Sequence, residues 1–182
     1  MAINKELLHN FIYISYQDVI EGKIFFKMCH NCRFYYVEFI IMYRELFKQY
    51  ENIKNFAGKA WQHAVNIELI EQESFKDCSL HCFHYQQMFE MFIKYLLETK
   101  SKFGSYSHTH KLHRLIEELI ENTDFKTDKT KYRMPLQVIT VCAEEYRYNF
   151  LIDCEAYNDS VKLANELLNE LINFASVERK IY

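Results

Sequence analysis

Residues 79–100 read SLHCFHYQQMFEMFIKYLLETK, and their apolar side chains cover most of the circumference of a helix. A helix that is apolar almost all round is typical of the interior of a bundle. The remaining polar residues recur at intervals of three or four: His84, Gln87, Glu90, Lys94 and Glu98. This spacing places these five residues, the polar stripe, along one side of the helix. We expect the segment to be the central, most buried helix.

The polar stripe has two interpretations. It is either the solvated side of an amphipathic helix, or the lining of a groove against a neighbouring helix that holds a polar network or a ligand. Glu90 and Lys94 form an i,i+4 pair in the favourable orientation, which fits both interpretations. The sequence leaves the choice open.

Helical spacing continues on both sides of this segment. The upstream residues FAGKAWQHAVNIELIEQ, 56–72, have helical spacing, and we expect further helices at about 111–122, 135–148 and 155–175. Pro135 is tolerated in the first turn of a helix. Only three glycines and one proline occur in 182 residues, too few for the turns of a β-sandwich or barrel. The sequence predicts an all-α fold, an up-and-down helical bundle with four to five core helices.

The two parts of the chain are expected to be an N-terminal helical extension, residues 1–54, and the bundle, residues 55–182. Residues 3–20 and 33–50 favour helices, although the segment before the second one would also permit a hairpin around Cys29–Cys32. The extension is rich in aromatic residues, among them Phe34, Tyr35, Tyr36, Phe39 and Tyr43. We expect these to pack on the bundle, with some contribution to a dimer contact.

Composition limits the class of protein. Hydrophobic residues make up 49% of the chain, which argues against disorder, and the net charge of −3 argues against a broad basic nucleic-acid surface. Lys5 and Glu6 stand where a signal peptide would be apolar. The apolar run 34–43 is shorter than the roughly 20 residues that span a bilayer. We expect a cytoplasmic protein with no membrane contact, whose six cysteines are reduced thiols.

Two consecutive segments resemble the signature of the HEPN domain family. They are HYQQMFEMFIKYLLETKSKF, 84–103, and HTHKLHRLIEEL, 108–119. In that signature a Gln, a Glu three residues on and a Lys four residues further share one helix, and a His precedes a Leu-rich helix. The matching residues here are Gln87, Glu90, Lys94 and His110.

Two flanking segments extend the resemblance to residues 55–176. Residues 60–87 resemble the first helix of the family and its connection. Residues 144–172 resemble the Arg-Tyr element and the final helix, with Arg147 and Tyr148 at the matching place.

The resemblance implies a helical bundle that is commonly dimeric. Some members act beside, or fused to, a minimal nucleotidyltransferase in toxin–antitoxin or resistance systems. Others are metal-independent endoribonucleases that use an Arg, four to six residues and then a His, where the His is a general base and the Arg stabilises the phosphorane. The same count from Arg147 reaches Ile152, Asp153 and Cys154. We therefore expect no ribonuclease activity of that kind and no catalytic residue.

The ligand-binding residues that the resemblance favours are Gln87, Glu90, Lys94, His110, Arg147 and Tyr148. The groove hypothesis requires the fold to bring Arg147 close to the polar stripe. Ordinary structural roles are open for the last three residues. Arg147 would form an ion pair with Glu144, Glu145 or Asp153, Tyr148 would pack in the core, and His110 would orient the connection between two helices.

We expect no metal and no cofactor. The Cys-x-x-Cys pair at Cys29 and Cys32 lacks the second pair that a structural zinc site needs. Cys78, His81 and Cys82 share one helical face, but packing and local hydrogen bonding explain such a group.

Three functions are compatible with the sequence. The first is a non-catalytic binding module, a homodimer that binds a nucleotide or RNA, or a nucleotidyltransferase protein. The second is a divergent metal-independent endoribonuclease that uses Arg147 with Asp153, His84 or His110. The third is a purely structural assembly module.

Overall fold

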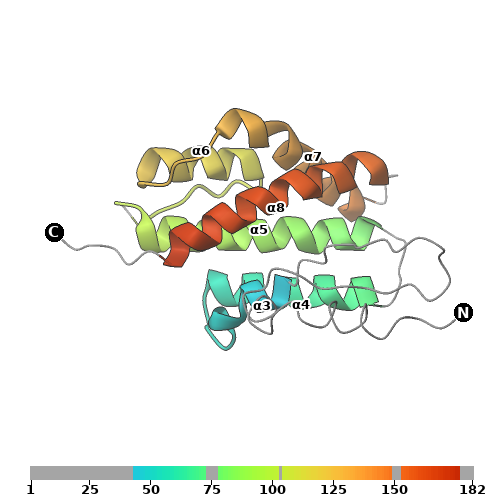
Figure 1. The fold of residues 1–182 in the computed structure, drawn as a ribbon, viewed down its shortest axis with the longest axis horizontal. Helices are drawn as coiled ribbons and strands as arrows, with labels where there is room; N and C mark the ends of the chain where they lie inside the picture. The colour runs from blue at the N-terminus through green and yellow to red at the C-terminus, as the bar shows by residue number, and fades with distance from the viewer. Residues whose placement is uncertain (1–42, 73–77, 103, 149–152, 177–182) are drawn as a thin grey trace, which may run out of the picture.

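The computed structural model describes residues 43–72, 78–102, 104–148 and 153–176. These residues form helices and no strand, which confirms the all-α bundle (Figure 1). The predictions for residues 3–20, for the Cys29–Cys32 segment and for most of 33–50 lie outside the described residues. The helices are α3 (Tyr43–Leu46), the 3-10 helix η1 (Lys48–Tyr50), α4 (Phe56–Gln72), α5 (Cys78–Lys100), α6 (Leu112–Asn122), α7 (Lys129–Arg147) and α8 (Cys154–Ser176).

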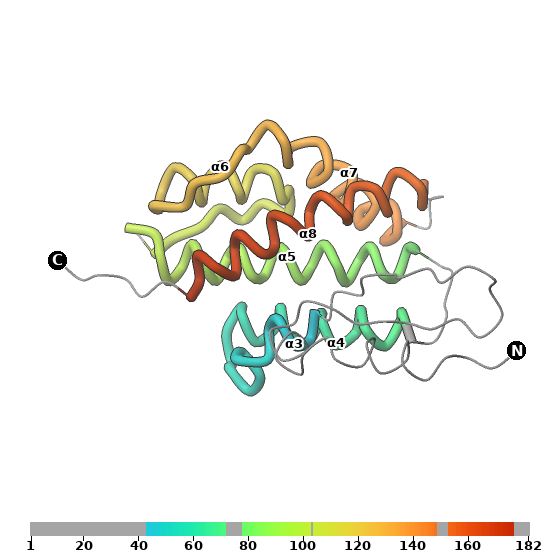
Figure 2. The backbone as a smooth tube through the Cα atoms, in the orientation of Figure 1, coloured from blue at the N-terminus to red at the C-terminus, as the bar shows by residue number. Residues whose placement is uncertain are grey.

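Helix α5 is the central helix, as its sequence predicts. It contacts α4 on one side and α6, α7 and α8 on the other (Figure 1). Its side chains Phe89, Ile93 and Leu97 are completely buried, and burial of each such side chain contributes about 1.5–3 kcal/mol. After α5 the chain runs back along the same helix before α6 begins (Figure 2). This return connection, residues 104–111, brings a polar segment alongside the polar stripe.

The short segment before α4 packs on the bundle. Tyr43, Phe47 and Tyr50 are buried, and the Phe47 ring lies 4.7 Å from the Phe92 ring of α5. The Tyr43 hydroxyl donates a hydrogen bond to Asn165 of α8 at 3.1 Å. The prediction that aromatic residues of the N-terminal segment pack on the bundle therefore holds for Tyr43. The domain division at residue 54 stays a prediction.

Helix α7 begins earlier than the sequence predicts. The predicted start near Pro135 is wrong, because Asp128 caps the helix and accepts hydrogen bonds from the backbone N–H groups of Thr130 and Lys131. This cap satisfies two of the donors that a helix start leaves unpaired. Pro135 is the seventh residue of the helix and costs it one backbone hydrogen bond. The predicted bounds of α4, α5, α6 and α8 agree with the structure within two residues.

The cysteines depart from the sequence prediction. A disulfide joins Cys78 at the start of α5 to Cys154 at the start of α8, with the two Cα atoms 5.8 Å apart. The expectation of reduced thiols is thus wrong for this pair, because the fold places the two helix starts side by side. Cys82 and Cys142 are free and buried. Within the described ranges no helix has the length and apolar character needed to cross a membrane.

Candidate functional site

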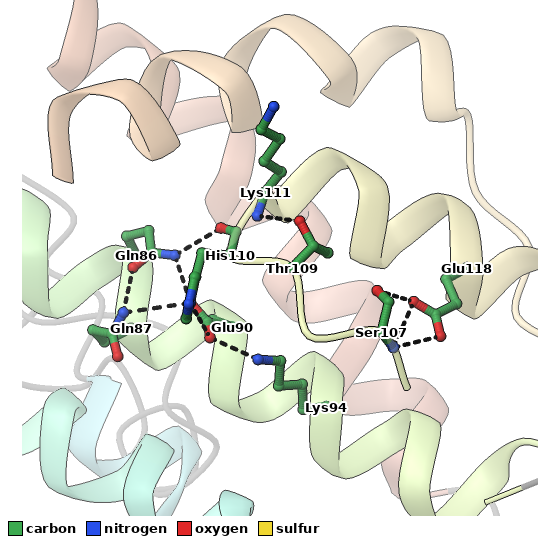
Figure 3. Close-up of polar contacts among 9 residues, drawn as sticks. All are labelled: Gln86, Gln87, Glu90, Lys94, Ser107, Thr109, His110, Lys111 and Glu118. Atoms are coloured by element: carbon green, nitrogen blue, oxygen red, sulfur yellow. Dashed lines mark hydrogen bonds and ion pairs between the residues drawn. The ribbon is translucent and has the colours of Figure 1, made fainter. Parts of the chain in front are cut away.

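A buried carboxylate, Glu90, is the centre of the candidate site (Figure 3). Its side chain is 1% exposed. Its Oε1 accepts hydrogen bonds from Lys94 Nζ at 2.8 Å and from His110 Nδ1 at 2.9 Å. Its Oε2 accepts from Gln86 Nε2 at 2.8 Å and from Gln87 Nε2 at 3.4 Å. We call these five residues the Glu90 cluster.

The Glu90 carboxyl is ionised at neutral pH. Burial alone would raise its pKa, but hydrogen bonds from Lys94 and Gln86, and the charges of Lys94 and His110, outweigh burial and lower the pKa of Glu90 below its usual value. Lys94 is also buried, and its ammonium lies 5.6 Å from the centre of the Tyr106 ring. The cluster therefore contains a paired and hydrogen-bonded charge inside the bundle.

The return connection is held against α5 and α6 by local hydrogen bonds (Figure 3). Gln86 Nε2 donates to the His110 backbone oxygen at 3.0 Å, and the Ser107 hydroxyl donates to Glu118 of α6 at 2.6 Å. Thr109 accepts a hydrogen bond from the backbone N–H of Lys111. These contacts fix the position of His110 immediately before α6.

His110 is the most exposed member of the Glu90 cluster. Its side chain is 56% exposed, while the Glu90 carboxylate that orients it is buried. Because Nδ1 donates to Glu90, Nε2 is the ring nitrogen that remains for a ligand. Nε2 accepts a hydrogen bond when the ring is neutral and donates one when the ring is protonated.

Different residues of the polar stripe fit different interpretations of the two that the sequence left open. Glu98 is exposed, as on a solvated face. Glu90 and Lys94 are buried, so the solvated-face interpretation is wrong for these two residues. The stripe holds the polar network that the alternative expects, and whether it also holds a ligand stays a prediction.

The first residue of the polar stripe, His84, pairs with a histidine of α4. Its Nδ1 lies 2.9 Å from the Nδ1 of His63. Burial, with a smaller contribution from His84, lowers the pKa of His63 to about 4, and the charge of Glu90 opposes this shift. Burial and the charge of His81 lower the pKa of His84 below its usual value. Such a pair needs at least one neutral ring to accept the hydrogen bond.

The histidine pair makes stability depend on pH. Between the folded pKa of His63, about 4, and its usual value of 6.5, the unfolded state binds more protons than the folded state. We therefore expect the free energy of unfolding to be highest above pH 6.5 and to fall as the pH drops toward 4. Urea denaturation at several pH values measures this slope, and His63→Phe should reduce it.

Other carboxylates contribute to the same slope, so the difference between the wild type and His63→Phe is the informative quantity. His108→Phe is the matched control, because His108 is exposed and its replacement should leave the slope unchanged. Equal slopes in the wild type and in His63→Phe would contradict the assigned role of the pair.

The fold does not join Arg147 and Tyr148 to the Glu90 cluster. Arg147 is exposed at the end of α7, and its Nε donates to the Ala143 backbone oxygen at 3.3 Å. No hydrogen bond or ion pair among the described residues connects either residue to the cluster. The neighbouring Tyr146 ring lies 5.5 Å from the Phe83 ring, and the Phe83 ring lies 5.3 Å from the ring of His84, the first residue of the polar stripe.

Two structural alternatives for these residues are also wrong. Arg147 forms no ion pair with Glu144, Glu145 or Asp153, although all three are described, and Asp153 instead accepts a hydrogen bond from the Ala156 backbone at the start of α8. Tyr148 does not pack in the core but is exposed. The fold therefore brings together Gln87, Glu90, Lys94 and His110, and a ligand-binding role for Arg147 and Tyr148 stays a prediction.

Sequence reasoning missed two members of the site environment, Gln86 and Tyr106. Gln86 is completely buried and donates to both Glu90 and His110. The signal that pointed to it was the repeated glutamine at 86 and 87. Across the described ranges, no three His, Cys, Asp or Glu side chains converge in the manner of a metal site.

Comparison with known protein families gives a match. A family model described as the HEPN domain matches residues 67–177, which include the whole Glu90 cluster as well as Arg147 and Tyr148. Neither a curated protein nor a solved structure matches the chain.

Proposed function

Since the chain belongs to the HEPN domain family, we propose that it is a non-catalytic binding module, a homodimer that binds the phosphate groups of a nucleotide beside His110. The observation that carries this proposal is the exposed His110 imidazole, oriented through Nδ1 by a buried and ionised Glu90. A protonated imidazole held in this way donates a charge-assisted hydrogen bond from Nε2 to a phosphate oxygen.

The surroundings of His110 favour an anionic ligand. Burial lowers the pKa of His113, the charge of Glu117 opposes this shift, and the charges of Arg114, Arg133 and Lys111 add to it, so three cations lie near this histidine. His110 also lies two residues before the start of α6, whose N-terminus carries the positive end of the helix dipole. The net charge of the chain is −3, so this positive region is local and suits a small ligand better than a long nucleic acid.

A nucleotidyltransferase protein is the partner that this proposal favours, because such an enzyme handles the same nucleotides. In this arrangement the chain would belong to a toxin–antitoxin or resistance-type system. A nucleotidyltransferase encoded beside this chain, co-expressed with a tagged copy of it, should co-purify with it. Failure to co-purify would contradict the proposed partner, and it would not affect the proposal that the chain binds a nucleotide.

We expect ATP and GTP to bind, and adenosine, which lacks phosphate, to bind at least ten-fold more weakly. His110→Gln removes a charge-assisted hydrogen bond worth about 1.5–3 kcal/mol and should weaken ATP binding by roughly 10- to 100-fold. Isothermal titration calorimetry measures both effects.

His108→Gln is the matched control, because His108 is also exposed and lies on the same connection but makes no contact with Glu90. It should bind ATP as the wild type does. Equal affinity for ATP and adenosine, or no heat at millimolar ATP, would overturn nucleotide binding through phosphate.

The Glu90–His110 pair also favours a second candidate, a divergent metal-independent endoribonuclease. A buried carboxylate that orients an imidazole is the arrangement by which enzymes position a general base. Labelled RNA incubated with the purified protein in EDTA separates the two candidates. Cleavage that is lost in His110→Gln favours the enzyme, whereas intact RNA together with ATP binding favours the binding module.

A further inference from the structure

Two free thiols, Cys82 of α5 and Cys142 of α7, lie in contact inside the bundle. The Cys82 side chain hydrogen-bonds to Cys142. Its Sγ also lies 4.0 Å from the backbone oxygen of Ile139, one turn before Cys142 on α7. Cys82 is completely buried and Cys142 is 4% exposed. Two thiols held in this way are placed to become a disulfide when they are oxidised.

The two thiols differ in acidity. The hydrogen bond from Cys82 lowers the pKa of Cys142 below its usual value, although burial and the charges of Glu145 and Asp153 oppose this shift. The hydrogen bond to Cys142, burial and the charges of Cys142 and Glu145 raise the pKa of Cys82. Because the thiolate is the nucleophilic form of cysteine, Cys142 is the thiol that reacts first and Cys82 is the one that remains protonated beside it.

The thiol pair lies one helical turn from the disulfide that is already present. Cys78 and Cys82 are four residues apart on α5, so they share one side of that helix. The disulfide joins Cys78 to Cys154 of α8. A link between Cys82 and Cys142 would therefore add α7 to the two helices that are tied together at this end of the bundle.

We propose that Cys82 and Cys142 are a dithiol that hydroperoxides oxidise to a second disulfide, which joins α5 to α7. The Cys142 thiolate attacks the terminal oxygen of the hydroperoxide, and the O–O bond breaks. Cys142 becomes a sulfenic acid, and the other oxygen takes up the proton that Cys142 lost and leaves as an alcohol, or as water from hydrogen peroxide.

Cys82 completes the reaction. Its sulfur attacks the Cys142 sulfur, the S–S bond forms and the S–O bond breaks, and the hydroxyl leaves with the Cys82 proton as water. Two thiols are thus oxidised and one hydroperoxide is reduced. This chemistry is separate from the proposed nucleotide binding and does not depend on it.

Peptide mapping of the full chain without reductant tests the proposal. Trypsin, which cuts after Lys and Arg, places the four cysteines in three peptides: Cys78 and Cys82 in 77–94, Cys142 in 134–147, and Cys154 in 148–162. In the untreated protein the first and third peptides are joined, and the second carries a free thiol. After treatment with hydrogen peroxide all three should be joined, and a reductant should release them.

Met134 is an internal control for the oxidant, because it is 65% exposed and lies on the same tryptic peptide as Cys142. The same reagent converts methionine to its sulfoxide. If Met134 is oxidised while Cys142 stays a free thiol, the proposal is overturned. It is also overturned if Cys142 reaches the sulfinic acid without a link to Cys82.

Single substitutions test the order of reaction. In Cys82→Ser, dimedone, which traps sulfenic acids, should label Cys142 after peroxide treatment. In Cys142→Ser the labelling of Cys82 should be at least about ten-fold weaker, because this thiol is completely buried and has a raised pKa. Equal labelling in the two variants would overturn the assigned roles.

Cys78→Ser/Cys154→Ser tests the pairing, with circular dichroism as the check that the variant folds. Cys82 and Cys142 are then the cysteines left on these peptides, so a link between 77–94 and 134–147 identifies the pair. A link that forms in the wild type but not in the folded variant would come from exchange with the existing disulfide, and it would contradict direct oxidation by the hydroperoxide.

Discussion

Glu90→Leu is expected to lower the free energy of unfolding by about 3–5 kcal/mol, because it leaves the buried Lys94 ammonium without a counter-charge. Gln86, Gln87 and His110 also lose their common acceptor in this variant. The double variant Glu90→Leu/Lys94→Met removes both buried charges and should recover part of the loss. Urea denaturation at pH 7, followed by circular dichroism, measures all three proteins.

Glu98→Leu is the matched control for this prediction. Glu98 lies one turn beyond Lys94 on the same polar stripe but is exposed, so its replacement should change stability by no more than about 0.5 kcal/mol. A similar effect of Glu90→Leu and Glu98→Leu would contradict the burial of the Glu90 cluster. A double variant less stable than Glu90→Leu would show that the charge pair is not what stabilises the site.

The part of the site that the sequence predicts is the part built within one helix. Glu90 and Lys94 are one turn apart, so their contact follows from helical geometry once α5 is recognised. Gln86 lies four residues before Glu90, so helical geometry also places it beside Glu90. The three-or-four spacing that defines the polar stripe selects its neighbour Gln87 instead. The burial of Gln86 depends on the return connection, which covers it through His110.

The parts that the sequence could not predict depend on how separate helices pack. His63 and His84 lie on different helices, and no spacing rule relates them. The position of Arg147 also depends on helix packing. Its place in the family pattern suggests that it lies close to the polar stripe, but at the end of α7 it is exposed to solvent. The start of α7 is predictable in principle, because Asp128 is a good N-cap residue, whereas Pro135 suggests a later start because proline is favoured in the first turn.

Reduction of the disulfide is expected to lower the free energy of unfolding by about 4 kcal/mol. Cys78 and Cys154 are 76 residues apart, and the chain-entropy model gives a value of this size for closing such a loop. Urea denaturation with and without a phosphine reductant measures the loss. Cys78→Ser/Cys154→Ser should have the stability of the reduced wild type and should not respond to the reductant.

The same experiment tests the structural role of the link between Cys78 and Cys154. Because α5 and α8 both begin at this link, its loss should loosen the end of the bundle at which Cys82 and Cys142 are buried. Thiol labelling of these two residues should therefore be faster after reduction. If the reductant changes neither stability nor labelling, and no peptide linking Cys78 to Cys154 is found by mass spectrometry, the two sulfurs are neighbouring thiols. The packing of α5 against α8 would then have to hold that end of the bundle without a covalent link.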